Sequence, residues 1–163
     1  MEQKKKHITK EVAFQKLQAY CAYQERCHSE VESKLYTLGI YDGDADAIIS
    51  QLIEDNFLNE ERFAIAYARG KFRMKSWGKI RIQQELKMRH IPDYSIAQAM
   101  KAIDTEGGYY ETLERVLAQK ALEYSDNDPQ KTAKLYAYGF RRGFESELIA
   151  QVLKLVRLED DEF

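Results

Sequence analysis

The fold is decided by residues 58–91, LNEERFAIAYARGKFRMKSWGKIRIQQELKMRHI. Asn59 is placed to cap a helix, and Glu60 and Glu61 suit its first turn, where the helix dipole favours negative charge. Apolar residues then recur at helical spacing until Trp77-Gly78 interrupts them, after which a second helical pattern follows. The stretch therefore predicts two helices separated by a short break.

Helical spacing continues in both directions along the chain, and the alternation typical of strands is nearly absent. The clearest apolar stripes are Phe14, Leu17 and Cys21; Ile48 and Leu52; Leu113 and Leu117; and Leu148, Val152 and Leu155. Helix starts are predicted at a capping box over residues 29–32, at Asp44, at Pro92 and at Asp128-Pro129. We therefore predict an all-α chain of about nine helices.

Three stretches of the chain share one pattern of helices and breaks. Their anchors Ile40, Ile91 and Phe144 lie roughly fifty residues apart, a period typical of helical repeats. We predict three tandem three-helix repeats forming an elongated, curved molecule, because each repeat packs mainly against its neighbours. The predicted organisation is a flexible basic N-terminus at 1–9, a first repeat at 10–57, a basic second repeat at 58–104, a third repeat at 105–158 and an acidic tail at 159–163.

Positive charge gathers in the second repeat, although the whole chain is slightly acidic, with 25 Lys and Arg against 27 Asp and Glu. The cations of this run are Arg69, Lys71, Arg73, Lys75, Lys79, Arg81, Lys87 and Arg89, and Arg141-Arg142 form a smaller patch in the third repeat. Such a cluster suits phosphates or an acidic protein surface; taken alone, it is equally compatible with a solvated charged face. Trp77 is predicted to anchor the core rather than to stack on a ligand, because a Trp buries a large area.

Motifs for catalysis, metals and cofactors are absent from the sequence. It has no phosphate-binding glycine loop, no nucleophile elbow and no paired-histidine zinc motif. Cys21, Cys27 and His28 supply too few ligands for a structural zinc site, so we predict two buried thiols. We expect no enzyme activity, no metal and no cofactor.

The compartment expected from the sequence is the cytoplasm. No apolar run approaches the roughly 20 residues that span a bilayer. The basic N-terminus is not followed by the apolar region of a secretory signal. We therefore expect no association with a membrane.

Residues 57–91, which are the central stretch together with Phe57, resemble the motif pattern of the RecX family, the bacterial regulators of the RecA recombinase. The matching positions are Leu58, Glu61, Arg62, Phe63, Ala64, Tyr67, Gly78, Ile82, Glu85, Leu86 and Ile91. Further matches, in the same order along the chain, are Ser29, Glu30, Leu35 and Gly39-Ile40 upstream and Arg142-Gly143-Phe144 downstream. The resemblance spans roughly residues 13–153.

Three positions depart from the family pattern. Asn59 stands where the family usually has an acidic residue, and it still suits a helix cap. His90 replaces a turn glycine, so we expect the backbone there to avoid positive φ. Gly139 replaces an apolar helical residue, and we expect it to weaken or kink its helix by up to ~1 kcal/mol.

The resemblance implies three three-helix repeats, in agreement with the spacing. It also implies a protein that lodges in the helical groove of the RecA–DNA filament, touches neighbouring RecA protomers and inhibits ATP hydrolysis, strand exchange, coprotease activity and filament growth by binding alone. Single-stranded DNA would be contacted weakly or through the filament, and we expect a monomer. The expected binding residues are the cations named above, with Trp77 and Gly78 positioning them.

Two other functions fit the same residues. A three-helix unit could present a recognition helix to nucleic acid as a stand-alone binder, but the near-neutral total charge argues against tight binding to a duplex. Alternatively, the chain is a helical adaptor for an unrelated protein, and the basic run serves only solubility. Salt-sensitive binding to naked DNA, with no effect on RecA, would favour the stand-alone binder.

Overall fold

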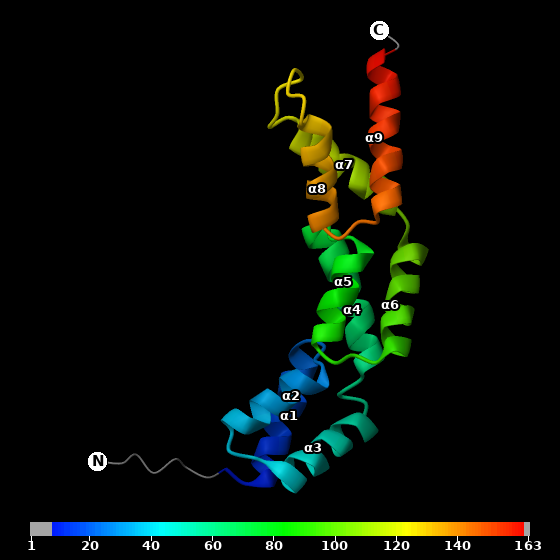
Figure 1. Ribbon diagram of the computed structural model, residues 1–163. Helices are drawn as coiled ribbons and strands as arrows, with labels where there is room; N and C mark the ends of the chain where they lie inside the picture. Colours follow the sequence, from blue (N-terminus) through cyan, green and yellow to red (C-terminus); the bar gives the residue numbers. More distant parts are fainter. Residues whose placement is uncertain (1–7, 162–163) are drawn as a thin grey trace, which may run out of the picture.

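The computed structural model describes the backbone of residues 8–161 and the side chains of residues 8–155. Residues 8–161 form nine α-helices and no strand, which confirms the predicted all-α class. The helices are α1 (Lys10–Tyr23), α2 (His28–Thr37), α3 (Asp42–Glu54), α4 (Glu60–Lys75), α5 (Lys79–Met88), α6 (Asp93–Glu106), α7 (Tyr109–Ala121), α8 (Lys131–Arg141) and α9 (Ser146–Asp161). They follow one another along an elongated, curved molecule, as predicted (Figure 1). Within the residues described, no helix combines the length and apolarity needed to cross a membrane.

We call α1–α3, α4–α6 and α7–α9 the first, middle and third units, and each has a hydrophobic core of its own. Fully buried core residues are Leu17, Leu35 and Leu52 in the first unit, Ile82, Leu86 and Ile103 in the middle unit, and Leu113, Phe144 and Ile149 in the third. Cys27 belongs to the first unit in sequence but packs in the core of the middle unit. Cys21 and Cys27 are both buried and free, which confirms the predicted thiols.

The ends of the helices do not all coincide with the predicted segment boundaries. Thr9 lies in the predicted N-terminal segment 1–9, but it caps α1: its side chain accepts from the Val12 amide at 3.2 Å. α6 continues to Glu106, past the predicted boundary at 104, and α9 continues to Asp161, inside the predicted acidic tail. Residues 1–7 and 162–163, the remainder of the two predicted end segments, lie outside the described residues.

Two predicted helix starts are confirmed, and the capping box is displaced. Asn59 Oδ1 accepts from the Arg62 amide at 2.9 Å, and Pro92 directly precedes α6. The box predicted over residues 29–32 is instead formed by Cys27, whose amide donates to Glu30 Oε2 at 3.3 Å. Cys27 has extended backbone and is fully buried, so its packing places the N-cap of α2 two residues before Ser29.

Two other predicted starts are wrong. α8 begins at Lys131, because Asp128 Oδ1 accepts from the Gln130 amide at 2.8 Å and closes a separate turn before the helix. α3 begins at Asp42, so Asp44 lies inside its first turn, where it pairs with Lys10 at 2.7 Å.

The two glycine-related departures have separate outcomes. His90 has φ +59°, so the left-handed turn is kept without the glycine and that expectation is wrong. The Ile91 amide donates to Leu86 O at 3.2 Å and helps to hold this turn. α8 continues past Gly139 to Arg141, and the expected weakening of this helix stays a prediction. A Cβ on Gly139 would lie 3.1 Å from Ile149 Cδ1, so glycine permits close packing of α8 on α9.

Candidate functional site

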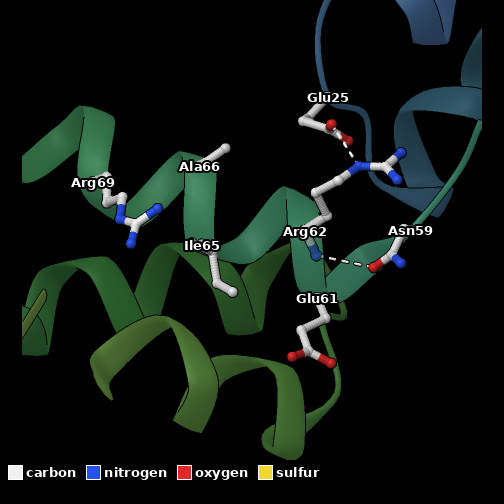
Figure 2. Close-up of a pocket in the computed structure, with 7 residues that line it drawn as sticks. All are labelled: Glu25, Asn59, Glu61, Arg62, Ile65, Ala66 and Arg69. Atoms are coloured by element: carbon white, nitrogen blue, oxygen red, sulfur yellow. Dashed lines mark hydrogen bonds and ion pairs between the residues drawn. The ribbon is translucent and has the colours of Figure 1, made fainter. Parts of the chain in front are cut away.

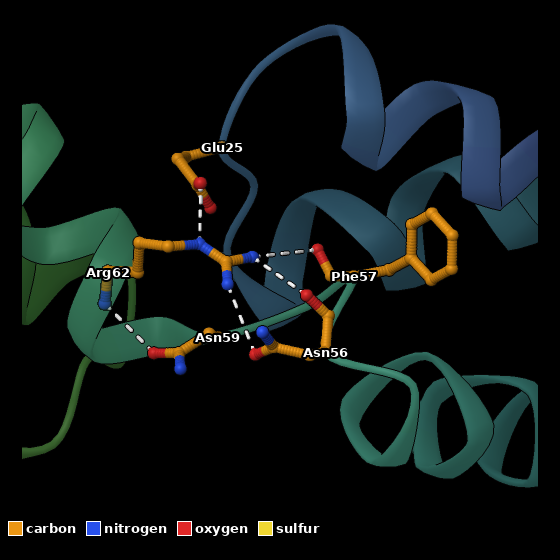
Figure 3. Close-up of polar contacts among 5 residues, drawn as sticks. All are labelled: Glu25, Asn56, Phe57, Asn59 and Arg62. Atoms are coloured by element: carbon orange, nitrogen blue, oxygen red, sulfur yellow. Dashed lines mark hydrogen bonds and ion pairs between the residues drawn. The ribbon is translucent and has the colours of Figure 1, made fainter.

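Arg62, in the first turn of α4, ties the middle unit to the first (Figure 3). Its Nε donates to Glu25 Oε1, in the loop after α1, at 2.6 Å. Its Nη1 donates to Asn56 Oδ1 at 3.1 Å, and its Nη2 donates to the backbone oxygens of Asn56 and Phe57 at 3.1 and 3.3 Å. These oxygens follow the C-terminus of α3, an end that favours a cation. One guanidinium therefore connects the α1–α2 loop, the end of α3 and the start of α4.

An open cleft of about 420 Å³ runs along α4 beside Arg62 (Figure 2). Ile65 and Ala66 contribute its apolar lining, and Arg69 lies two turns after Arg62 on the same helix. The Arg62 guanidinium is engaged in the contacts between the first and middle units, whereas the Arg69 side chain has no partner among the described residues. Arg69 is thus the cation of this cleft that an external anion can reach.

Replacing Arg62 with lysine is expected to lower the free energy of unfolding by about 1–2 kcal/mol. Lysine keeps the charge but lacks the planar fork that holds Glu25 and the two backbone oxygens together. Urea denaturation followed by circular dichroism measures the change. The control Arg69→Lys should stay within ~0.5 kcal/mol of wild type. Equal unfolding free energies for the two variants would contradict the structural role of Arg62.

The start of α5 is capped by the third unit rather than by side chains of its own. A helix leaves its first amide groups without internal partners, and three amides here find acceptors beyond the middle unit. The bonds run from Gly78 N to Arg142 O (2.8 Å), from Lys79 N to Tyr109 Oη (2.9 Å) and from Ile80 N to Gly143 O (3.0 Å). These acceptors also offset the positive side chains at the start of α5, which the helix dipole disfavours.

Gly78 and Gly143 allow the two backbones to meet at this joint. A Cβ on Gly78 would lie 2.2 Å from Gly143 O, and a Cβ on Gly143 would lie 2.3 Å from Arg81 Cβ. Gly143 also has φ +95°, in the region that favours glycine. The close contact of Gly78 with Gly143, just after α8, therefore sets the position of the turn that carries Trp77.

Tyr109 lies at the centre of the same joint. Its hydroxyl donates to Glu145 Oε2 at 2.6 Å while accepting from the Lys79 amide. Its ring packs between Phe72 and Phe144, with centroids 5.8 and 5.2 Å away. Burial, and then the hydrogen bond to Glu145, raise the pKa of Tyr109 far above its ordinary value.

The unfolding free energy is expected to fall as pH rises above about 10, because Tyr109 ionises more readily in the unfolded chain than in the folded one. A raised folded-state pKa gives stability that is fully present below the unfolded pKa and is lost above it. Tyr109→Phe removes this pH-dependent part of the stability. At pH 7 the substitution should lower the free energy of unfolding by about 1–3 kcal/mol, because it leaves the Lys79 amide and Glu145 without their partner. In urea unfolding the stability advantage of wild type over Tyr109→Phe should shrink from neutral to strongly alkaline pH. An advantage that stays constant would contradict this role.

The cations predicted as binding residues have different surroundings in the structure. Three are ion-paired within the chain, and two of the acidic partners come from the last turn of α6. The pairs are Arg73 with Glu106, Lys79 with Asp104, and Arg89 with Glu85 (3.2 Å). These three cations support the middle unit as well as contributing to its charge.

Trp77 holds two further cations. The Arg81 guanidinium lies 3.9 Å from the ring centroid, and Lys71 Nζ lies 4.9 Å from it. The indole is partly buried and packs against the core of the middle unit, which confirms its predicted role as a core anchor. Trp77 thereby orders part of the basic surface.

Arg142 contacts the end of α4. Its Nη2 donates to the backbone oxygens of Lys75 and Ser76. Arg115 Nη2 adds a bond to Ser76 Oγ at 3.0 Å, and Ser76 has φ +52°. Two cations of the third unit are therefore placed at a helix C-terminus, where the dipole favours positive charge.

Two family models and several relatives match this chain. The RecX second three-helix domain matches residues 59–100, and the RecX third three-helix domain matches residues 108–153. The regulatory protein RecX of Chlorobaculum tepidum is 31% identical over 134 residues, which cover 81% of this chain and 80% of that protein. The chain belongs to the RecX family.

Other RecX proteins are similar at lower identity. The regulatory protein RecX of Prosthecochloris aestuarii is 25% identical over 134 residues, which cover 82% of this chain and 86% of that protein. The crystal structure of RecX from Lactobacillus salivarius has a TM-score of 0.77 at 24% identity, covering 91% of this chain and 97% of that one. The structural likeness shows a shared fold.

The two matched RecX domains contain every cation predicted as a binding residue. Four of these are exposed, and their side chains have no ion pair, hydrogen bond or ring contact within residues 8–155: Arg69, Lys75, Lys87 and Arg141. We call them the free cations. Their charges are not engaged by any other described side chain.

Sequence reasoning missed most residues that hold the joints of this RecX chain. Tyr109, Arg115 and Glu145 were not singled out as site residues, and Arg62 stood out only as a position that resembles the family motif. Arg62 bonds Glu25 across 37 residues, Tyr109 bonds Glu145 across 36, and Arg115 bonds Ser76 across 39. Local spacing contains no signal for contacts at such separations.

Proposed function

We propose that this protein binds in the helical groove of the RecA–DNA filament and, by binding alone, inhibits the ATPase, recombinase and coprotease activities of RecA. The observation that carries the proposal is the set of free cations on a chain of the RecX family. The family resemblance suggests the partner, and the free cations supply the chemistry for an anionic groove. The same partner implies a cytoplasmic location.

Charge is strongly separated between the units. Residues 58–104 contain ten Lys and Arg against five Asp and Glu, whereas residues 10–57 contain four against nine. The Debye length at physiological salt is about 8 Å, so a surface in contact with the middle unit responds mainly to the charge of that unit. A nucleoprotein groove lined with phosphates would attract it, and the affinity would fall as salt rises.

The joints favour contact along the length of a groove. Arg62 connects the first and middle units, and the Gly78–Gly143 contact connects the middle and third units. A curved surface that is already ordered loses less conformational freedom on binding. With a net charge of −2, the protein has little overall attraction to free DNA, so we propose that DNA is reached through the filament, by a monomer.

ATP hydrolysis by RecA of the same organism on single-stranded DNA, titrated with this protein, tests the proposal. We expect hydrolysis to be lost at substoichiometric protein, because one molecule that contacts several protomers affects more than one active site. The control reaction replaces this protein with an unrelated helical protein of similar net charge. Undiminished hydrolysis at saturating protein would contradict the proposal.

A further inference from the structure

The first unit has an aromatic cleft that none of the contacts described above explains. It has a volume of about 660 Å³, lies between α2 and the start of α3, and is lined in part by Tyr36, Tyr41, Ile40 and Ile49. The two tyrosine rings meet edge to face, with centroids 5.2 Å apart and planes at 64°. Tyr36 is 69% exposed and Tyr41 51% exposed, so their rings are open to a partner. Exposed aromatic rings around a concave surface are typical of protein binding sites.

Carboxylates border the same cleft, and no Lys or Arg lines it. Glu32, Asp42 and Asp46 belong to its lining, and none of them has an ion pair among the described residues. The nearby cations are used elsewhere: Lys10 pairs with Asp44 at 2.7 Å, and Lys34 Nζ lies over the ring of Tyr20. The cleft therefore combines open aromatic faces with negative charge that no cation of residues 8–155 pairs with.

We propose that this cleft binds an arginine-bearing segment of a protein partner. A guanidinium stacks on aromatic faces and forms paired hydrogen bonds with carboxylates, so it matches both features of the cleft. Phosphates are repelled by the same carboxylates, so nucleic acid is the wrong occupant. Charge complementarity, not the apolar lining alone, identifies the ligand.

This site assigns different partners to different units of the molecule. The first unit contacts protein through the aromatic cleft, and the middle and third units contact phosphates through the free cations. Within the filament, the cleft takes an arginine of a RecA protomer while the free cations face the nucleic acid. That division rests on the proposed function, whereas the preference of the cleft for arginine does not.

A direct test uses an acetylated, amidated hexapeptide of alternating glycine and arginine, titrated into the full chain and followed by NMR. We expect shifts of resonances from residues that line the cleft, and no such shifts with the matching glycine–glutamate peptide. Asp42→Asn with Asp46→Asn should weaken arginine-peptide binding about fivefold or more. Asparagine also tolerates the φ of +49° at position 42, so this variant retains the fold.

The control variant is Glu54→Gln with Asp55→Asn, which changes the charge at the other end of α3 by the same amount. It should bind the peptide within about twofold of wild type. Equal weakening by both variants, shifts spread over all acidic residues, or no shifts would overturn the proposal. Sedimentation that shows a dimer dissociated by the peptide would overturn it too, because the occupant would then be a second copy of the chain.

A crosslinking experiment on RecA filaments separates this inference from the proposed function. A photo-crosslinking amino acid at Tyr36 should label an arginine-containing segment of RecA in assembled filaments. Specific peptide binding without any binding to filaments would leave the cleft assignment intact and contradict the proposed function. Crosslinking to DNA instead of protein would overturn the cleft assignment.

Discussion

Replacing the free cations Arg69, Lys75, Lys87 and Arg141 together with glutamate should weaken binding to RecA filaments by about 100-fold or more. Their side chains are exposed and have no partner within the described residues, so the change removes external contacts while the joints stay intact. The salt dependence of binding should also become shallower, because fewer counterions are released from phosphates. Cosedimentation with filaments at two salt concentrations measures both effects.

The matched control replaces four other lysines with glutamate and reaches the same net charge. Its positions are Lys16, Lys34, Lys101 and Lys154. Binding by this control should fall much less than binding by the free-cation variant, because none of these lysines belongs to the free cations that are proposed to face the nucleic acid. Equal losses in the two variants would assign the effect to net charge and remove the site assignment.

Replacing Gly78 with alanine should destabilise the protein by roughly 3 kcal/mol or more. The new Cβ would lie 2.2 Å from Gly143 O and 2.4 Å from the Phe144 amide nitrogen. Both neighbours are backbone atoms, so no side-chain rotation relieves the clash. The joint must open, and the amide groups at the start of α5 then lose the acceptors that the third unit supplies. Urea unfolding followed by fluorescence of Trp77, the single tryptophan, measures the loss next to the joint.

Gly70→Ala is the matched control for this substitution. Gly70 lies inside α4, and a Cβ there would meet nothing within 4 Å. Alanine should therefore stabilise the helix by up to ~1 kcal/mol. A Gly78→Ala variant as stable as Gly70→Ala would show that the close backbone contact does not hold the middle and third units together.

Much of the fold follows from short-range patterns in the chain. Helical spacing predicts the all-α class, because each helix buries one stripe of apolar residues, and Asn59 caps its helix as its side chain suggests. The predicted start of α2 is wrong because two possible capping residues, Cys27 and Ser29, lie close together. Cys27 prevails over Ser29 because Cys27 is buried in the core of the middle unit, a tertiary contact with no local signal.

The candidate site is predictable only in part. The run of positive charge is visible in the sequence, but its division into paired and free cations is not. Arg73 pairs with Glu106 across 33 residues, so its charge is compensated by a helix that the local sequence does not indicate. Likewise, the unfavourable cations at the start of α5 are explained only by acceptors from the third unit.

Cosedimentation of this protein with RecA filaments, compared with naked single-stranded DNA at the same nucleotide concentration, tests the central claim most directly. The filaments are assembled with a non-hydrolysable ATP analogue so that inhibition of the ATPase does not alter their amount. Binding to filaments should be tighter than binding to the naked DNA by about tenfold or more, because only the filament offers protein contacts in addition to phosphate contacts. Equal binding to the two, or no binding to the filaments, would contradict the account.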